Sequence, residues 1–535
     1  MDVDYIVIGA GSAGAVVAAR LSEDPALCVA LLEAGPPDTN PWIHVPVGYF
    51  RTMGNPATDW CYRTEPDPGL AGRAIAWPRG RVLGGSSSIN GLLYVRGQRE
   101  DYDGWRQLGN PGWGWDDVLP LFRRAERWED AGADPDGLRG RDGPIAVGRS
   151  RLSRSAVDAW LEAAVAAGYS RNPDYNGRVQ EGVAHFQMTA DRGRRASTAV
   201  GYLRPARNRP NLEILTRTAV TRLVIAGDRV VGVEARRGGE ILRLTARAEV
   251  ILSAGAIATP QLLMVSGIGP PDALRAHGIA VARAAPGVGQ NLQDHLQARP
   301  VYRCRARTIN TEIRNPLRKL AMAIEYALFR TGPMTMAASL GTAFLKTDPR
   351  LATPDIQFHI QPFSADSPAE GPHPFDAITA SVLQLRPEST GRIVLKSPDM
   401  AVAPAIHPNY LATETDCATL VAGIRIARKI AATPPFRDLV VFEHAPGPGV
   451  PDDAARLLDW ARRTAVTIYH PTGTAKMGPE SDPMAVVDPR LRVRGVANLR
   501  VADASIFPTI PSGNTNAPAI MVGEKASDLI LADAR

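Results

Sequence analysis

Residues 4–35 read DYIVIGAGSAGAVVAARLSEDPALCVALLEAG, and this stretch decides the fold. Residues 5–8 are an apolar run rich in β-branched side chains, which is typical of a parallel strand buried on both faces. A G-x-G-x-x-G loop follows at residues 9–14, then a helical pattern to residue 21, then a second buried strand over residues 28–32. The order strand, glycine loop, helix, strand predicts the opening of a doubly wound α/β domain.

The glycine loop predicts a dinucleotide site. Gly9 permits the tight turn, Gly11 lets backbone N–H groups approach a pyrophosphate, and Gly14 lets helix and strand pack closely. The helix N-terminus adds partial positive charge for the phosphates. Glu33 ends the second strand, where a carboxylate accepts hydrogen bonds from a ribose diol. The motif alone does not say which dinucleotide binds.

Size and composition narrow the class of protein. The chain has 535 residues, enough for two or three intertwined domains, and its 44% hydrophobic and 22% charged residues are ordinary for a globular protein. No apolar run approaches the ~18 residues of a membrane span. The first strand begins within five residues of Met1, so we expect no signal peptide. The four cysteines lie far apart without metal-ligand spacing, so we expect no metal and a reducing, cytoplasmic compartment.

The charge is mildly basic, with a formal value of +6 and a pI of about 9.2. The basic residues are scattered, and no basic run is interleaved with aromatics, so nucleic acid is not an expected partner. Mild attraction to an anionic substrate, an electron acceptor or a membrane surface stays open. The sequence does not predict the oligomeric state.

The remaining pattern places functional loops at both ends of the chain. Residues 36–75 lack periodicity and carry Trp42, Tyr49, Phe50 and Trp60, which suggests a lid. Helical patterns cover residues 116–127, 155–168, 259–265 and 317–329, and residues 212–252 form strands with a turn at 227–228. The last hundred residues return to dense Gly, Pro, Asn and His. We expect these loops to meet the N-terminal ones at one site.

Three blocks carry a family resemblance. They are GRVLGGSSSIN at residues 80–90, GAIATPQLL followed by SGIG over residues 255–269, and a C-terminal block with His470 in YHPTGTAKMG and Asn514. Together with the opening fingerprint, these blocks resemble the glucose–methanol–choline (GMC) flavin oxidoreductases, in their order and over essentially the whole chain. The sequences of these motifs are most similar to those of bacterial choline-dehydrogenase-like and sorbose-dehydrogenase-like members. The resemblance implies bound FAD rather than NAD.

It also implies an α/β fold in which a Rossmann-like FAD-binding domain carries a smaller α+β substrate domain built from discontinuous segments. We expect residues 1–155, 205–300 and 480–535 to form the FAD-binding domain. Residues 156–204 and 301–479 would form the substrate-binding domain.

The resemblance assigns the cofactor contacts by position. In some relatives a histidine at the position of Ile89 bonds covalently to the flavin; isoleucine cannot, so we expect noncovalent FAD. The residues that would hold FAD are Gly9, Gly11, Ser12, Ala13, Gly14, Glu33, Ala34, Val82, Gly85, Asn90, Gly91, Leu92, Leu93, Val220, Ala254, Gly255, Tyr469, Asp503, Ala504, Asn514 and Thr515.

His470 and Asn514 are the expected catalytic pair. An imidazole can accept a hydroxyl proton near neutral pH while hydride leaves the carbinol carbon for flavin N5. Asn514 can hydrogen-bond the substrate oxygen but is no base, and it could also cap the helix that follows, over residues 515–530. The remaining histidines receive a structural interpretation: His44, His185, His277, His295, His359, His373, His407 and His444.

The expected reaction is therefore oxidation of a primary alcohol to the aldehyde, with electrons passing to a quinone or dye-type acceptor. Oxidation by O2 stays open, because one residue, Ile468, cannot decide the acceptor. Some proteins that resemble this chain are hydroxynitrile lyases or a light-driven fatty-acid decarboxylase, and a cofactor-binding protein without activity is a further alternative. The sequence shows no aromatic cage over residues 300–450, so choline is not favoured over aryl, furanic, aliphatic or polyol alcohols.

Overall fold

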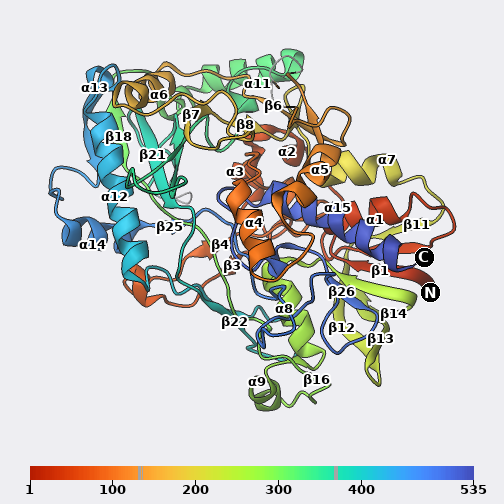
Figure 1. Cartoon of the computed structure of the whole chain (residues 1–535). Helices are drawn as coiled ribbons and strands as arrows, with labels where there is room; N and C mark the ends of the chain where they lie inside the picture. Colours follow the sequence, from red (N-terminus) through yellow and green to blue (C-terminus); the bar gives the residue numbers. More distant parts are fainter. Residues whose placement is uncertain (131–133, 135–136, 367–370, 535) are drawn as a thin grey trace.

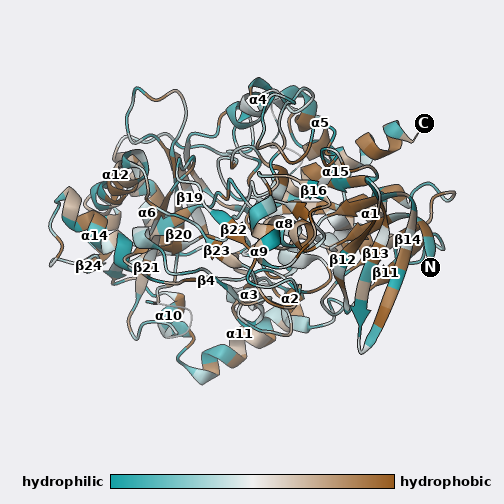
Figure 2. Cartoon of the chain, turned by 90° about the horizontal axis from the view of Figure 1, so that it is seen from below, coloured by the Kyte–Doolittle hydropathy of each residue, from teal (hydrophilic) through white to brown (hydrophobic). Residues whose placement is uncertain are grey.

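A computed structural model describes residues 1–130, 134, 137–366 and 371–534. Two large sheets dominate it, one of seven strands and one of eight (Figure 1). The fold is that of an α/β protein with a second, antiparallel sheet, which confirms the predicted fold class. Figure 2 shows apolar residues gathered along α1 (Gly14–Leu21), α8 (Gly255–Val265) and the neighbouring strands.

The seven-stranded sheet contains the opening stretch. Its order is β11-β2-β1-β14-β13-β12, with β26 added beside β14. The pairs β11–β2, β2–β1, β1–β14 and β14–β26 are parallel, whereas β12 to β14 form an antiparallel meander. The strands are β1 (Asp2–Ile8), β2 (Val29–Leu32), β11 (Leu212–Leu215), β12 (Thr218–Ala226), β13 (Arg229–Arg237), β14 (Glu240–Leu252) and β26 (Leu499–Val501).

Apolar side chains hold this sheet against its helices. Ile6 and Val7 of β1 are fully buried, and burial of each such side chain contributes about 1.5–3 kcal/mol. Helix α1 packs beside α15 (Asn516–Asp533), so the first and last helices of the chain lie together on the sheet (Figure 1). Elements far apart in sequence therefore converge at the carboxyl ends of β1, β14 and β26.

The eight-stranded sheet lies apart from this one (Figure 1). Its order is β24-β18-β21-β20-β19-β7, with β17 joining β21 to β25, and every pair is antiparallel. Helices α6 (Ser155–Ala166) and α12 (Glu414–Ala431) pack on it. The strands are β7 (Gly182–His185), β17 (Leu296–Ala298), β18 (Val301–Cys304), β19 (Gly341–Leu345), β20 (Ile356–Gln361), β21 (Ala377–Gln384), β24 (Val440–Ala445) and β25 (Val466–Thr467).

Three predicted helix boundaries need correction. Helix α5 (Trp115–Ala125) ends before residue 127, because Glu126 begins β5 (Glu126–Trp128), which pairs with β6 (Ile145–Arg149). Helix α8 begins at Gly255 rather than residue 259, since the Asp503 carboxylate accepts the Gly255 N–H (2.8 Å). Helix α15 continues past residue 530 to Asp533.

Residues 36–75 contain several short elements rather than an open loop. They include α2 (Pro41–His44), η1 (Pro46–Gly48), α3 (Tyr49–Thr52), β3 (Tyr62–Arg63) and η2 (Pro68–Leu70). All four cysteines are free. None of the helices in the described part of the chain is long and apolar enough to cross a membrane.

Candidate active site

The loop that carries His470 is held tightly by buried polar contacts. The His470 backbone N–H donates to Asp294 Oδ1 (2.7 Å), and the Thr467 hydroxyl donates to Asp294 Oδ2 (2.5 Å). Tyr469 between them has φ +72°, a left-handed conformation that is costly for a bulky residue, and its carbonyl accepts a hydrogen bond from Arg79 (2.6 Å). Asp294 thus sets the position of the His470 backbone.

Burial raises the pKa of Asp294 to about 6, although hydrogen bonds from Thr467, Tyr410 and His470 oppose that shift. A carboxyl group with no solvent access favours its neutral form. The hydrogen bonds it accepts here favour the ionised form instead.

The His470 ring lies between Asn514 and a second histidine, His295. His470 Nε2 is 3.0 Å from Asn514 Nδ2, and His470 Nδ1 is 3.0 Å from His295 Nδ1. The other ring nitrogen of His295, Nε2, is 2.8 Å from the Leu385 carbonyl oxygen. Four segments of the chain therefore meet in one row of polar groups.

This row fixes where the protons lie. A carbonyl oxygen only accepts, so His295 Nε2 carries the hydrogen and neutral His295 Nδ1 is an acceptor. His470 Nδ1 must then donate to it, which leaves His470 Nε2 without a hydrogen and lets it accept from the Asn514 amide. The unprotonated nitrogen of His470 is the one that lies beside Asn514.

Burial keeps both rings neutral. It lowers the pKa of His295 to about 4, against the opposing effect of the Leu385 carbonyl. The pKa of His470 is lowered well below its usual value, first by burial and then by the nearby His295, His359 and Arg79. The pKa of His359 falls to about 3 for the same first reason. At neutral pH the site thus contains an uncharged imidazole that can accept a proton.

Asn514 does not cap the helix that follows. Helix α15 begins at Asn516 after Thr515, without a side-chain cap, while the Asn514 amide faces His470. Its Oδ1 is buried and has no partner among the described residues. This oxygen is therefore available to a bound molecule.

The residues assigned to the cofactor come from every part of the chain. They lie after β1 (Gly9, Gly11, Ser12, Ala13, Gly14), after β2 (Glu33, Ala34), after β4 (Val82, Gly85, Asn90, Gly91, Leu92, Leu93), in β12 (Val220), after β14 (Ala254, Gly255), after β25 (Tyr469), after β26 (Asp503, Ala504) and before α15 (Asn514, Thr515). Strand β4 spans Ala76–Trp77.

Several of them touch one another. A Cβ on Gly85 would lie 2.6 Å from Gly11 Cα, so the two glycine loops approach as closely as backbone allows. Ser12 Oγ donates to Asn516 Oδ1 (2.8 Å), which joins the first loop to the last helix. Asp503 accepts from the Gly255 N–H and from the Thr259 hydroxyl (2.6 Å).

Glu33 lies where the fingerprint predicts, at the end of β2, and is buried. Its carboxylate accepts the backbone N–H groups of Ala10 (3.0 Å) and Gly35 (2.8 Å). Burial raises its pKa to about 7, while these two hydrogen bonds oppose the rise. Val220 follows Thr218, whose N–H donates to the Glu33 carbonyl (2.8 Å), so both positions lie at the same edge.

An unused polar group fits an elongated polar cofactor at this place. One guanidinium nitrogen of Arg195, Nη2, is buried without a partner in the described part of the chain. A buried polar atom without a partner is costly, so such groups are normally satisfied when the ligand binds. Arg195 also donates to Asn90 Oδ1 (2.7 Å) and to the Ser87 carbonyl (3.1 Å), which holds the second glycine loop in place.

Arg195, Asp294 and His295 are among the site residues that the sequence did not indicate. Arginine is abundant in this chain, and His295 directly precedes the short strand β17 and belongs to no motif of its own. The HxxxH-like or cysteine spacings that reveal metal histidines are absent around it. Only the fold brings it to His470.

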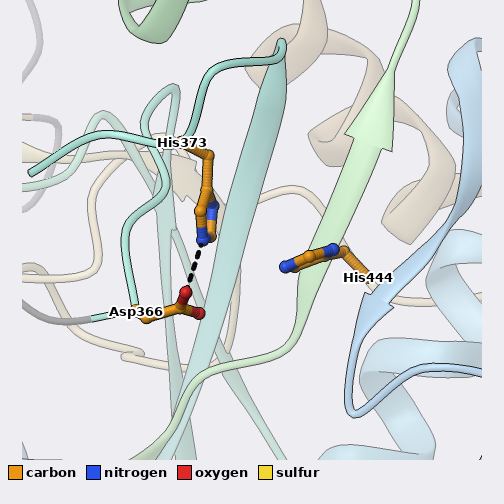
Figure 3. Close-up of side chains that lie close together, drawn as sticks. All are labelled: Asp366, His373 and His444. Atoms are coloured by element: carbon orange, nitrogen blue, oxygen red, sulfur yellow. Dashed lines mark ion pairs between the residues drawn. The ribbon is translucent and has the colours of Figure 1, made fainter. Parts of the chain in front are cut away.

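A separate cluster contains Asp366, His373 and His444, whose ligand atoms lie within 4.8 Å of one another (Figure 3). His373 pairs with Asp366 (3.1 Å) through Nε2, and its Nδ1 contacts Ser364 Oγ (3.0 Å). Of the two ring nitrogens of His373, Nδ1 has a hydrogen-bond partner, and Nε2 has, among the described residues, only the charge contact with Asp366. We assign no metal to this cluster.

A cleft of about 1080 Å³ also opens beside α1 and α5. Its lining includes Arg20, Arg123 and Tyr202 but none of the residues predicted for the cofactor or for catalysis. It is therefore not part of the site around His470.

Comparison with known proteins gives matches along nearly the whole chain. The family models described as GMC oxidoreductase match residues 3–297 and 387–523. The mitochondrial choline dehydrogenase of Homo sapiens is 44% identical over 98% of this chain and 89% of its own length. An alcohol dehydrogenase [acceptor] of Pseudomonas putida is 42% identical over 99% and 95%.

Solved structures agree with this. Pyridoxine 4-oxidase from Mesorbium loti matches with a TM-score of 0.88 and 32% identity, over 98% of both chains. A formate oxidase variant of Aspergillus oryzae matches with a TM-score of 0.91 and 29% identity, over 99% of this chain and 98% of that one. The similarity covers both sheets and every segment that meets at His470.

Proposed function

Because the chain belongs to the GMC oxidoreductase family, we propose that it oxidises a primary alcohol to the aldehyde with His470 as the base. It is an FAD-dependent oxidoreductase that acts on CH–OH donors. The observation that carries the proposal is the neutral His470 ring, whose unprotonated Nε2 faces Asn514 in a buried site.

The residues divide the chemistry between them. FAD, when bound, supplies the two-electron acceptor that takes the hydride from the carbinol carbon. His470 Nε2 takes the hydroxyl proton of the alcohol, so the O–H bond breaks as the carbonyl forms. His470 Nδ1 then donates to neutral His295, which helps to stabilise the new positive charge. Asn514 orients the substrate oxygen with its amide group.

We propose that FAD is held without a covalent bond. Ile89 is buried beside Ile43 and Val82 and offers no nucleophile. The proposed contacts are the glycine loops, Glu33, Asp503 and Arg195. Acid precipitation of the purified protein should leave all of the flavin in the supernatant; flavin that stays with the pellet would contradict this part of the proposal.

The acceptor is proposed to be a quinone or dye-type molecule. The alcohol dehydrogenase of P. putida carries the word "acceptor" in its name, and it aligns over nearly the whole chain. The alternative is O2, because pyridoxine 4-oxidase and formate oxidase share the fold. A hydroxynitrile lyase is the least favoured: the His470–Asn514 pair is compatible with it, but the relatives reported above are dehydrogenases and oxidases.

The test is anaerobic mixing of the purified yellow protein with a panel of primary alcohols, read by the flavin absorbance. Bleaching is the expected result. Lack of bleaching with every alcohol, together with cleavage of a cyanohydrin, would replace the proposal with the lyase. Addition of a dye acceptor or of air to the bleached enzyme then separates dehydrogenase from oxidase.

A further inference from the structure

Helix α11 (Pro316–Phe329) lies on the surface with its apolar side turned outward. Asn315 caps it, since its Oδ1 accepts the N–H groups of Leu317 (2.9 Å) and Arg318 (3.3 Å). Tyr326 is its one buried residue among those described, and the Tyr326 hydroxyl donates to the Gly193 carbonyl (3.1 Å). The helix is therefore well formed, but it packs against the protein mainly on the side that carries Tyr326.

The exposed side of α11 is a continuous apolar stripe. At 3.6 residues per turn, positions 317, 320, 324 and 328 fall on one side and position 326 on the opposite one. A surface helix normally turns such a stripe toward the core. Here the exposed fractions are 76% for Leu317, 58% for Leu320, 50% for Ile324 and 69% for Leu328, and Phe329 beside them is 68% exposed. We call these five side chains the α11 stripe.

The α11 stripe adjoins residues 36–75, the segment expected from the sequence to form a lid. The turn η5 (Pro333–Thr335) packs on both α11 and η1 of the lid, and α11, α2 and α3 lie along one edge of the molecule in Figure 2. Trp42 and Phe50 in these lid helices are 39% and 45% exposed. Tyr49, next to Phe50, is buried in a cluster that Ile468 packs against. The same face thus joins exposed apolar side chains to the cover of the site.

The apolar face is bordered by unpaired positive charge. The two carboxylates of this segment are already bonded, Glu312 to Arg154 (2.8 Å) and Glu325 to the Thr331 hydroxyl (3.0 Å). The exposed cations near this face make no ion pair with any described residue. They are Arg314 and Arg318 at the start of α11, Lys319 on the side of α11 that carries Tyr326, Arg192 and Arg194 beside Gly193, and Arg51, which stacks on the Trp42 ring (5.8 Å). Apolar side chains flanked by cations match a partner surface that has an outer layer of negative charge and an apolar interior beneath it.

We propose that the α11 stripe and the lid aromatics Trp42 and Phe50 dock on the surface of an anionic lipid bilayer, with α11 lying in the plane of the interface. Helices that bind in this way have an apolar face, a rim of Lys and Arg, and aromatic neighbours. A helix of 14 residues is about 21 Å long at 1.5 Å per residue, too short to span the hydrocarbon core of about 30 Å.

A second copy of the chain is a poorer occupant of this face. A two-fold dimer places the same patch on both partners. The unpaired cations that border the α11 stripe would then face one another, and like charges across an interface weaken it. An anionic lipid surface supplies the opposite charge. The proposal does not depend on the chemistry at His470, and it places the lid against the membrane.

The test is co-sedimentation of the FAD-loaded full chain with vesicles. Vesicles of phosphatidylcholine mixed with phosphatidylglycerol should pellet the protein, and added salt should release it. The combined substitution Leu320→Ser, Ile324→Ser and Leu328→Ser should lower partitioning at least about tenfold, because apolar area no longer enters the interface. Replacing Arg314, Arg318 and Lys319 by Gln should remove the preference for anionic over neutral vesicles.

A matched control keeps the experiment specific. Ile241→Ser removes another isoleucine that is 66% exposed, in β14 away from α11, and should leave vesicle binding unchanged. Failure of the wild-type protein to pellet with anionic vesicles would overturn the proposal, and so would equal binding of the stripe variant. A concentration-dependent dimer in sedimentation velocity that the stripe variant abolishes would assign the face to a second copy instead.

Alcohol-dependent bleaching of the flavin is measured in parallel. The stripe variant should bleach with a water-soluble alcohol as fast as the wild type, because the α11 stripe does not contact His470. Loss of vesicle binding with intact bleaching supports the docking face. Absence of bleaching in the wild type would refute the proposed reaction while leaving the vesicle result valid.

Discussion

The glycine loop at residues 9–14 and the group around His470 are built in opposite ways. The loop is one continuous stretch between β1 and α1, whose shape follows from local sequence. The proposed catalytic group takes His295, Leu385, His470 and Asn514 from four separate segments. A contiguous motif can thus be recognised without the fold, whereas a row of hydrogen bonds between distant segments appears only in three dimensions.

The largest expected effect separates binding from chemistry. Substitution His470→Gln keeps a polar side chain of similar length but removes the base, so flavin reduction by alcohol should slow by about 10²–10⁴-fold. The FAD content of the purified variant should stay at the wild-type level, since the glycine loops are intact. Stopped-flow absorbance measures both. A variant that reduces its flavin at nearly the normal rate would remove His470 from the role of base.

Substitution Gly85→Val tests the other region. Gly85 has φ +53° and its Cβ would lie 2.6 Å from Gly11 Cα, so a valine must push the two glycine loops apart. We expect the purified variant to contain less than about a tenth of the normal flavin, because the cradle no longer closes. The ratio of absorbance at 450 and 280 nm measures it. As a control, Gly54→Val at an open surface turn should keep its flavin.

His295 tests whether the row of hydrogen bonds matters. His295→Ala removes the acceptor of the His470 Nδ1–H, so the ring can adopt the wrong tautomer and flavin reduction should slow by about tenfold. His295→Asn restores an acceptor oxygen and should recover part of the rate. The pH profile of flavin reduction should change in the Ala variant, which simple loss of packing would not cause. Equal rates in wild type and Ala variant would make His295 a packing residue.

The last expected effect is on stability and its pH dependence, rather than on flavin content or rate. In the unfolded chain a histidine takes up its proton near pH 6.5, whereas in the native state His295 does so near pH 4 and His359 near pH 3. The unfolded state therefore binds more protons between those values, and the free energy of unfolding falls as the pH drops below about 6.5. At about 1.36 kcal/mol per pKa unit, each histidine contributes on the order of 3–5 kcal/mol to this loss once the pH lies below its native pKa.

Urea unfolding at several pH values measures this dependence. His359→Asn should flatten the decline, whereas His185→Asn at an exposed position serves as the matched control. Asp294 acts in the opposite direction, because a carboxyl pKa raised to about 6 adds stability that is complete below about pH 4 and is lost as the pH rises through 6. If the free energy of unfolding of His359→Asn depends on pH as it does in the wild type, burial of this ring does not destabilise the native state at low pH.

Much of this molecule follows from its sequence. The βαβ opening, the hairpin at residues 227–228 and the fold class agree with the structure, because each depends on periodicity or turn chemistry within a short stretch. The start of α8 could not be predicted, since it depends on Asp503, which lies nearly 250 residues away. His295 and Arg195 carry no local signature either. Their roles depend on which strands pair, and strand pairing cannot be predicted from any single segment of the sequence.

The pairing of the first and last helices has a consequence for synthesis of the protein. Strand β26 fills its place beside β14 only after residue 501 has been made, and α15 then fastens onto α1 through Glu524, which accepts from Arg20 (2.8 Å) and Tyr202 (2.7 Å). A nascent chain still on the ribosome therefore has an open edge at β14 and lacks Asn514. The proposed flavin contacts at Asp503, Ala504, Asn514 and Thr515 are also made in the last stage of synthesis. The chain is therefore most prone to aggregation before the end of its synthesis, while the β14 edge is unpaired. A chaperone that covers this edge would act at that stage.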